Sequence, residues 1–128
     1  MIVDTSALLA IFFDEPERDE FIRKIGASEL VGVGAPTLAE TAIVVSARLG
    51  EQGPRQLAQI VEHANLIVVP FDGPHWQVAA VAWLRFGRGR HEAALNLGDC
   101  LTYATARLAD RPLLFKGNDF NRTDLALA

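Results

Sequence analysis

The chain has 128 residues, half of them hydrophobic, and its 16 Asp and Glu against 12 Lys and Arg give a net charge of −4. Its length suits one domain spanning residues 1–128, its single cysteine excludes an internal disulfide, and no run of about 18 uncharged apolar residues is present for a membrane span, so we expect a cytoplasmic protein. The negative charge argues against binding of nucleic acid mainly by bulk electrostatics, because Lys and Arg supply that attraction.

The first half of the chain predicts strands that alternate with helices. Ile2–Val3 and residues 30–34 are short apolar segments bounded by turn-forming or polar residues, which favours strands. Residues 7–13 are an apolar run behind potential capping residues, and residues 16–26 carry apolar side chains at helical spacing. Residues 36–50 begin with a proline, which suits the first turn of a helix. We expect helices over these three ranges.

The second half continues this alternation. Helices are predicted for residues 54–64, 74–86 and 99–110 from the spacing of their apolar side chains. Residues 66–70 and 113–115 are short and apolar, which indicates strands. Strands that are apolar throughout are typical of a parallel sheet covered on both faces. The sequence therefore predicts an α/β fold, a three-layer sandwich with a central, mostly parallel sheet.

Four acidic residues fall at related positions in this predicted fold. In an open α/β sheet, the carboxyl ends of the strands and the amino ends of the helices lie along one edge, where ligands collect. Asp4 follows the first strand, and Glu40 lies early in the helix after the second. Asp99 opens the helix that leads into the fourth strand, and Asp119 follows that strand. We expect all four at this carboxyl edge of the sheet.

Each acid also has a simpler interpretation. Asp4 and Asp99 can be helix N-caps, and Asp119 can be a turn residue. Glu40 is harder to explain in this way, because about three turns of its helix are otherwise uncharged. We expect it to be buried on at least one side, and buried acids are rare unless they are paired or bind a cation.

Four carboxylates close together repel one another. At an effective dielectric constant of about 20 and a separation of ~6 Å, each pair repels by roughly 3 kcal/mol. Such a cluster has to take up protons or bind a cation, and ligands that are all oxygens suit Mg²⁺ or Mn²⁺. The three histidines stand singly, without the spacing of zinc ligands. Hydrolysis of a phosphodiester bond is the chemistry that fits such a site best.

Several motifs resemble those of one known family. They are the segment 1–8 with Asp4 and Ser6, the Glu40 helix, Gly98-Asp99-Cys100 at a helix start, and the segment 116–124 after the last strand. In order and spacing they resemble PIN-domain proteins of the VapC group, over essentially the whole chain. The resemblance implies a single PIN domain and an Mg²⁺- or Mn²⁺-dependent endoribonuclease. It also implies a toxin that forms a homodimer and is held inactive by a cognate antitoxin.

The resemblance assigns roles by position. Ser6 would lie beside the metal ligands and hydrogen-bond to them. Asn118 and Asp124 are further candidates, and the choice between Asp119 and Asp124 as the fourth acid stays open, although Asp119 lies closer to the strand end. The metal-ligand and catalytic roles fall on Asp4, Glu40, Asp99 and Asp119.

Two other features bear on binding. Arg88 and Arg90 lie in a glycine-broken stretch, residues 85–91, which either holds RNA phosphates or is an ordinary solvated loop. Trp76, Trp83 and Phe86 share a helical face, and we expect them in the core rather than at an interface. An exposed part of that face, or the Phe12–Phe13 region, is a candidate docking groove for a partner.

Two alternatives remain. A non-catalytic regulatory module would keep the acids as helix caps and only bind a partner protein. A phosphatase with Asp4 as its nucleophile is disfavoured, because Ser6 occupies the position where that chemistry needs a second acid.

Overall fold

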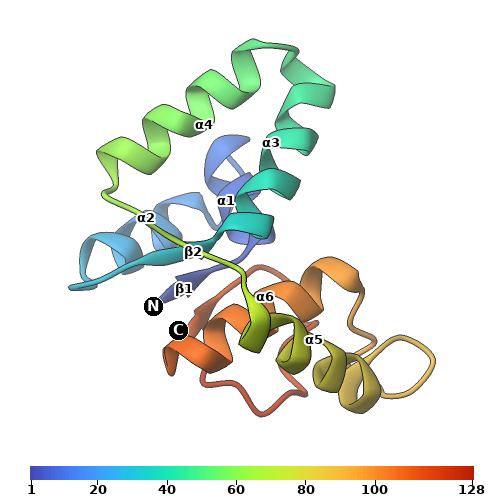
Figure 1. The fold of residues 1–128 in the computed structure, drawn as a ribbon. Helices are drawn as coiled ribbons and strands as arrows, with labels where there is room; N and C mark the ends of the chain where they lie inside the picture. Colours follow the sequence, from blue (N-terminus) through green and yellow to red (C-terminus); the bar gives the residue numbers. More distant parts are fainter.

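Four short parallel strands lie at the centre of the protein (Figure 1). Their order in the sheet is β3-β2-β1-β4. The structure is a computed structural model that describes residues 1–128. Every strand pairing is parallel, which confirms the predicted sheet. Because β1 is flanked by β2 and β4, the residues that follow these three strands meet along the carboxyl edge. The strands are β1 (Ile2–Val3), β2 (Gly32–Gly34), β3 (Ile67–Val69) and β4 (Leu113–Leu114).

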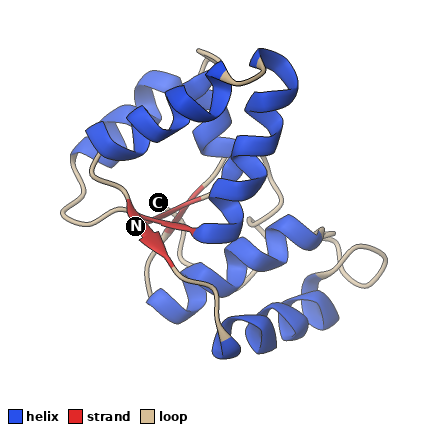
Figure 2. Ribbon diagram, turned by 45° about the horizontal axis from the view of Figure 1, so that its top comes forward, coloured by secondary structure: helices blue, strands red, loops and turns tan.

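Six helices pack around the sheet, so that the strands lie between helical layers (Figure 2). Their number and order agree with the prediction, and their bounds differ from it by a few residues. None of them has the length and apolar character of a membrane span. They are α1 (Thr5–Phe12), α2 (Arg18–Gly26), α3 (Ala35–Leu49), α4 (Gln52–His63), α5 (Gly73–Phe86) and α6 (Leu97–Ala109).

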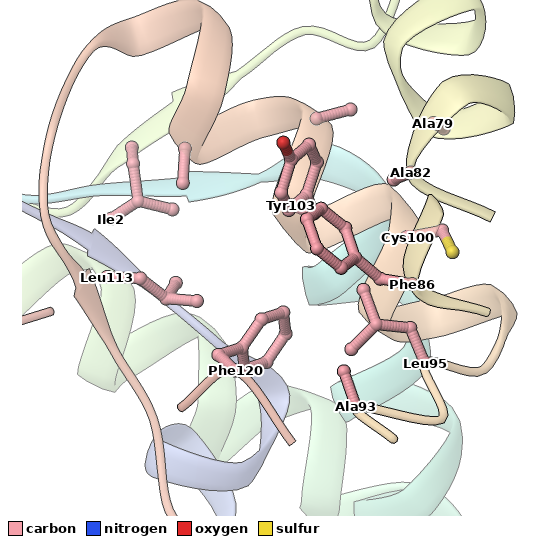
Figure 3. Packing of buried hydrophobic residues seen from close by; sticks show 12 residues of the cluster. Ile2, Ala79, Ala82, Phe86, Ala93, Leu95, Cys100, Tyr103, Leu113 and Phe120 are labelled. Atoms are coloured by element: carbon pink, nitrogen blue, oxygen red, sulfur yellow. The ribbon is translucent and has the colours of Figure 1, made fainter. Parts of the chain in front are cut away.

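The two faces of the sheet carry separate hydrophobic cores. Successive side chains of a strand point to opposite faces, so Ile2 joins the core under α5 and α6 while Val3 joins the core under α1 and α2. Leu113 and Leu114 divide in the same way. Figure 3 shows Phe120, which follows β4, within the first of these cores. The chain after β4 is therefore anchored next to the carboxyl edge.

The prediction that the sheet is covered on both faces is wrong at β3. Ile67 and Val68 are 50% and 46% exposed. As the last strand in the sheet, β3 pairs only with β2, so its apolar sequence does not imply burial.

The prediction that the tryptophans of α5 lie in the core is also wrong. Trp76 is 60% exposed and Trp83 is 40% exposed. Helix α5 instead turns Ala79, Ala82 and Phe86 toward α6, and these three residues are buried. The two alanines leave little side-chain volume between the helices, and the larger rings lie at the margin of the contact.

Candidate active site

Asp4 is the most firmly held of the four acids. It follows β1, it is only 6% exposed, and its side chain caps α1, so the N-cap interpretation of this residue is correct. Its Oδ2 accepts hydrogen bonds from the Ser6 backbone N–H at 2.9 Å and the Ser6 hydroxyl at 2.6 Å. Its Oδ1 accepts one from the Thr102 hydroxyl at 2.8 Å. Asp4 thus connects the end of β1 to α6.

Asp99 is held by the first turn of α6. The helix begins at Leu97 with Asn96 as its N-cap, so the prediction that Asp99 opens the helix is wrong by two residues. The Asn96 N–H donates to Asp99 Oδ2 and the Asp99 N–H donates to Asn96 Oδ1, both at 2.9 Å. This capping box satisfies two backbone donors and fixes the Asp99 carboxylate at the helix start.

The pKa of Asp99 shows that the other acids are near. This pKa is raised to about 6, and burial is the largest cause. The hydrogen bond from the Asn96 backbone opposes the rise, and the negative charges of Asp4, Asp119 and Glu40 contribute to it. The fold therefore brings the four predicted acids into one electrostatic cluster, which we call the acidic cluster.

Glu40 reaches the acidic cluster from α3. The residue as a whole is exposed, so the prediction of burial holds only for the side of its carboxylate that lies against Gly98. Desolvation raises the pKa of Glu40, the Asp4 charge raises it further, and a hydrogen bond from Thr5 lowers it. A Cβ atom at position 98 would collide with Glu40 Oε2. Glycine before Asp99 therefore gives the Glu40 carboxylate its place beside α6.

Asp119 lies in the exposed turn after β4, as the turn interpretation predicts. Asp124 lies apart from the acidic cluster. Its Oδ1 accepts a hydrogen bond from the Tyr103 hydroxyl at 2.6 Å, and its Oδ2 accepts one from Arg85 at 3.3 Å. Partial burial opposes ionisation of Asp124, but these two partners lower its pKa overall. Asn118 is engaged within the turn, where its side chain accepts from Asn121.

None of the four acids has a basic partner. The ion pairs of the protein involve other carboxylates, and Lys116, just after β4, is paired with Glu15 and Glu17. As the side chains stand, no three Asp, Glu, His or Cys residues lie close enough together to share one metal ion. The set of donors, all carboxylate oxygens without a neutralising side chain, nevertheless fits Mg²⁺ or Mn²⁺.

A group of buried threonines lies beneath Asp4 and was not predicted from the sequence. Thr102 is 1% exposed, and its hydroxyl lies 3.2 Å from that of Thr37 on α3. Thr41 donates to the Thr37 carbonyl at 2.8 Å. Helical spacing is the one signal that could have pointed to Thr102. It follows Asp99 by three residues and therefore shares the same face of α6.

The basic stretch divides into two parts. Arg85 belongs to α5 and pairs with Asp124, so it is not part of the loop. Arg88 and Arg90 are exposed in the turn that follows. Arg88 also lines an apolar groove of about 550 Å³, together with Trp76 and Leu97. Arg88 therefore lies near the start of α6, which begins two residues before Asp99.

The fold and the site together define a class of protein. It consists of α/β proteins with a parallel sheet and an acidic cluster at the carboxyl edge of that sheet. The PIN domain family model matches residues 1–125. Ribonuclease VapC30 of Mycobacterium tuberculosis is 40% identical over 126 residues, which cover 98% of this chain and 96% of that protein. The chain belongs to the PIN-domain family, and its relatives are VapC proteins.

Solved structures agree with this fold. The crystal structure of VapC20 from M. tuberculosis, described as a sarcin-ricin loop cleaving toxin, superposes with a TM-score of 0.80. The two chains are 18% identical, and the match covers 99% of this chain and 97% of that one. A toxin-antitoxin complex from Klebsiella pneumoniae matches with a TM-score of 0.74 and 15% identity, over 99% and 95% of the two chains.

Proposed function

We propose that this protein is a metal-dependent endoribonuclease and the toxin of a toxin-antitoxin pair. The observation that carries the proposal is the acidic cluster, in which three carboxylate charges act on Asp99 and no basic side chain neutralises them. The relatives that match along the whole chain are ribonucleases by name, which supports RNA as the substrate. Their activity fits the chemistry that an oxygen-ligated divalent ion performs on a phosphodiester.

Asp4, Glu40, Asp99 and Asp119 would hold Mg²⁺ or Mn²⁺. When bound in such a site, the ion lowers the pKa of water and neutralises charge that develops on the phosphodiester. Asp4 and Asp99 are fixed by hydrogen bonds before any ion binds. Glu40 and Asp119 are exposed residues whose side chains can rotate toward the fixed pair. The site thus combines two preorganised ligands with two adjustable ones.

We also propose that Arg88 and Arg90 bind phosphates of the RNA. They are exposed, neither forms an ion pair within the chain, and their turn lies shortly before the start of α6. Guanidinium groups make short, bidentate hydrogen bonds to phosphate oxygens. Because the net charge of the chain is −4, such local contacts have to provide most of the attraction for RNA.

The antitoxin is proposed to bind an apolar groove of about 1030 Å³ between α1, α2 and α4. Phe12 lines this groove, and so do Ile22, Leu30 and Ile67, which are among the exposed large hydrophobic residues of the protein. An amphipathic segment of a partner buries its apolar face in a groove of this kind. The match to a toxin-antitoxin complex supports a partner protein.

The homodimer is proposed to form through the opposite side of the molecule. The apolar groove of about 550 Å³ described above is lined by Trp76, Trp83 and Leu97. Leu97 is among the most exposed apolar residues in the chain. Contiguous exposed apolar side chains on a small protein mark a contact surface. Substitution of Leu97 by Asp should convert a dimer to a monomer in light scattering, whereas an unchanged mass would contradict this assignment.

RNA cleavage by two matched variants tests the proposed function. Asp99→Asn removes one charge of the acidic cluster and keeps the shape of the side chain, whereas Asp110→Asn makes the same change at the exposed C-cap of α6. We expect Asp99→Asn to lose cleavage by at least ~100-fold in Mg²⁺, and Asp110→Asn to cleave as the unaltered protein does. Full activity of Asp99→Asn, or undiminished cleavage by the unaltered protein in EDTA, would contradict the proposal.

A second candidate is a non-catalytic module that only binds a partner. Two observations favour it: the side chains of Asp4 and Asp99 both accept hydrogen bonds at helix N-termini, and no three acids stand within reach of one ion. Binding of Mg²⁺ to the folded state has to raise the melting temperature. A module without a metal site should show no such rise.

A further inference from the structure

The hydrogen bonds of Asp4 leave very little of its carboxylate free. Each carboxylate oxygen can accept about two hydrogen bonds. The N–H and the hydroxyl of Ser6 both donate to Oδ2, at 2.9 and 2.6 Å. The Ser6 hydroxyl accepts from the Lys116 backbone N–H at 2.9 Å, which leaves its own proton for Asp4. Oδ2 is therefore saturated.

The other oxygen, Oδ1, has one donor. The Thr102 hydroxyl donates to it at 2.8 Å, and Thr102 and Asp4 are 1% and 6% exposed. A hydroxyl has a single proton. Because Thr102 gives its proton to Asp4, Thr37 has to be the donor in the 3.2 Å contact between the two threonine hydroxyls. The result is a directed chain of hydrogen bonds from Thr37 to Thr102 to Asp4.

These hydrogen bonds join the elements that carry Asp4, Glu40 and Asp99. Thr37 precedes Glu40 by three residues on α3, and Thr102 follows Asp99 by three residues on α6. Residues three apart lie on one face of a helix. The same faces of α3 and α6 that present Glu40 and Asp99 therefore also present the hydroxyls that hold Asp4.

We propose that Thr102 is a positioning residue for metal binding by Asp4. Its hydroxyl fixes the carboxylate so that Oδ1 is the one Asp4 oxygen with a free lone pair for a cation, and Asp4 binds through that oxygen alone. This inference rests on the proposed function, because it concerns the ion that the acidic cluster holds. The role assigned to Thr102 depends on its hydrogen bond to Asp4, which joins residues 98 positions apart in the sequence.

Three variants separate positioning from packing. Thr102→Val keeps the volume of the side chain and removes the donor. Thr102→Ser keeps the donor and removes a methyl group. Thr105→Val is the matched control, because Thr105 is equally buried on α6 but donates only to the Leu101 carbonyl at 3.0 Å. Melting temperatures in EDTA report whether each variant folds.

The test is the affinity for Mn²⁺, measured by electron paramagnetic resonance of the free ion. Loss of a group that orients a ligand typically weakens metal binding by about 10- to 100-fold, so we expect Thr102→Val to bind Mn²⁺ at least ~10-fold more weakly. Thr102→Ser should recover most of that loss, and Thr105→Val should bind as the unaltered protein does. RNA cleavage by Thr102→Val should return as Mg²⁺ is raised, which a purely structural defect would not allow.

Equal Mn²⁺ affinity of folded Thr102→Val and Thr105→Val would overturn the positioning role. Should Thr102→Val not fold, Thr102→Ala takes its place, because it also removes the donor to Asp4, and an unchanged affinity in that variant is equally contrary. If the unaltered protein binds Mn²⁺ but cleaves no RNA, and Thr102→Val binds Mn²⁺ more weakly than Thr105→Val, the proposed nuclease fails while the role of Thr102 stands. If it cleaves RNA and Thr102→Val keeps full affinity, the nuclease stands and the role of Thr102 fails.

Discussion

The fold treats two groups of acids differently. Glu15 and Glu17 converge on the ammonium group of Lys116, and Asp124 is paired with Arg85. In these places the chain supplies its own cations. The acidic cluster of Asp4, Glu40, Asp99 and Asp119 has no Lys or Arg partner, although Lys116 lies three residues before Asp119.

The difference shows in the pKa values. The pKa of Glu17 is lowered, by a backbone hydrogen bond first and by Lys116 next, whereas the pKa of Asp99 is raised to about 6. An uncompensated cluster destabilises the fold, and a domain of this size has only about 5 to 15 kcal/mol of net stability. The comparison is the basis for our proposal that the cluster holds a cation that comes from solution.

After the loss of cleavage in Asp99→Asn, the next largest effect is expected from Gly98→Ala. A methyl group at this position collides with Glu40 Oε2, so Glu40 is pushed away from the acidic cluster. We expect RNA cleavage to fall by at least ~10-fold, while replacement of a helical glycine by alanine raises stability by up to about 1 kcal/mol. Gly73→Ala, at the start of α5 with open space around it, is the control. Full activity of Gly98→Ala would show that the position of Glu40 does not matter.

The next effect concerns how the free energy of unfolding depends on pH when no metal is present. The folded-state pKa of Asp99 is about 6, above its value of 3.8 in the unfolded chain. The folded state therefore holds the proton more tightly, and the stability that this confers is complete below pH 3.8 and is lost as the pH rises through 6. Allowing for the partial exposure of Asp99, the loss is about 1 to 2 kcal/mol.

Asp99→Asn should remove this loss. In EDTA at neutral pH the variant should melt at a higher temperature than the unaltered protein, and the difference should shrink as the pH falls from 6 toward 4. Thermal unfolding followed by circular dichroism measures both quantities. A lower melting temperature for Asp99→Asn across this range would mean that the negative charge stabilises the fold and that the cluster is not under electrostatic stress.

The smallest effect is expected from Lys116→Met. This change leaves Glu15 and Glu17 without their cation, but the three side chains are about a third exposed, and solvent screens their interaction. We expect a small drop in melting temperature that added salt diminishes, because salt screens exposed charges. A drop larger than the gain in Asp99→Asn would reverse the contrast between the two groups of acids.

The order of strands and helices was predictable because hydrophobic spacing and proline positions are local signals. The exposure of individual apolar side chains was less predictable. The apolar sequence of β3 does not reveal that the strand lies at the sheet edge, and the positions of Trp76 and Trp83 depend on how α5 rotates against α6. Both outcomes are set by tertiary packing.

For the site, topology made the convergence of the four acids predictable, because chain positions after parallel strands meet at one edge. Their role as metal ligands stays a prediction. The hydrogen bonds of these acids were not predictable. Nothing near Asp4 in the sequence indicates Thr102, since the contact spans 98 residues. The separation of Asp124 from the acidic cluster likewise depends on Arg85 and Tyr103, which come from two other helices.

The central claim is that the acidic cluster needs a cation from solution, and the melting temperature of the unaltered protein as Mg²⁺ is added tests it most directly. At a concentration 100 times the dissociation constant, binding to the folded state adds about 2.7 kcal/mol of stability, a rise of several degrees for a domain of this size. We predict that rise at neutral pH, and we predict that Asp99→Asn abolishes most of it. An unchanged melting temperature from EDTA to millimolar Mg²⁺ would contradict the claim.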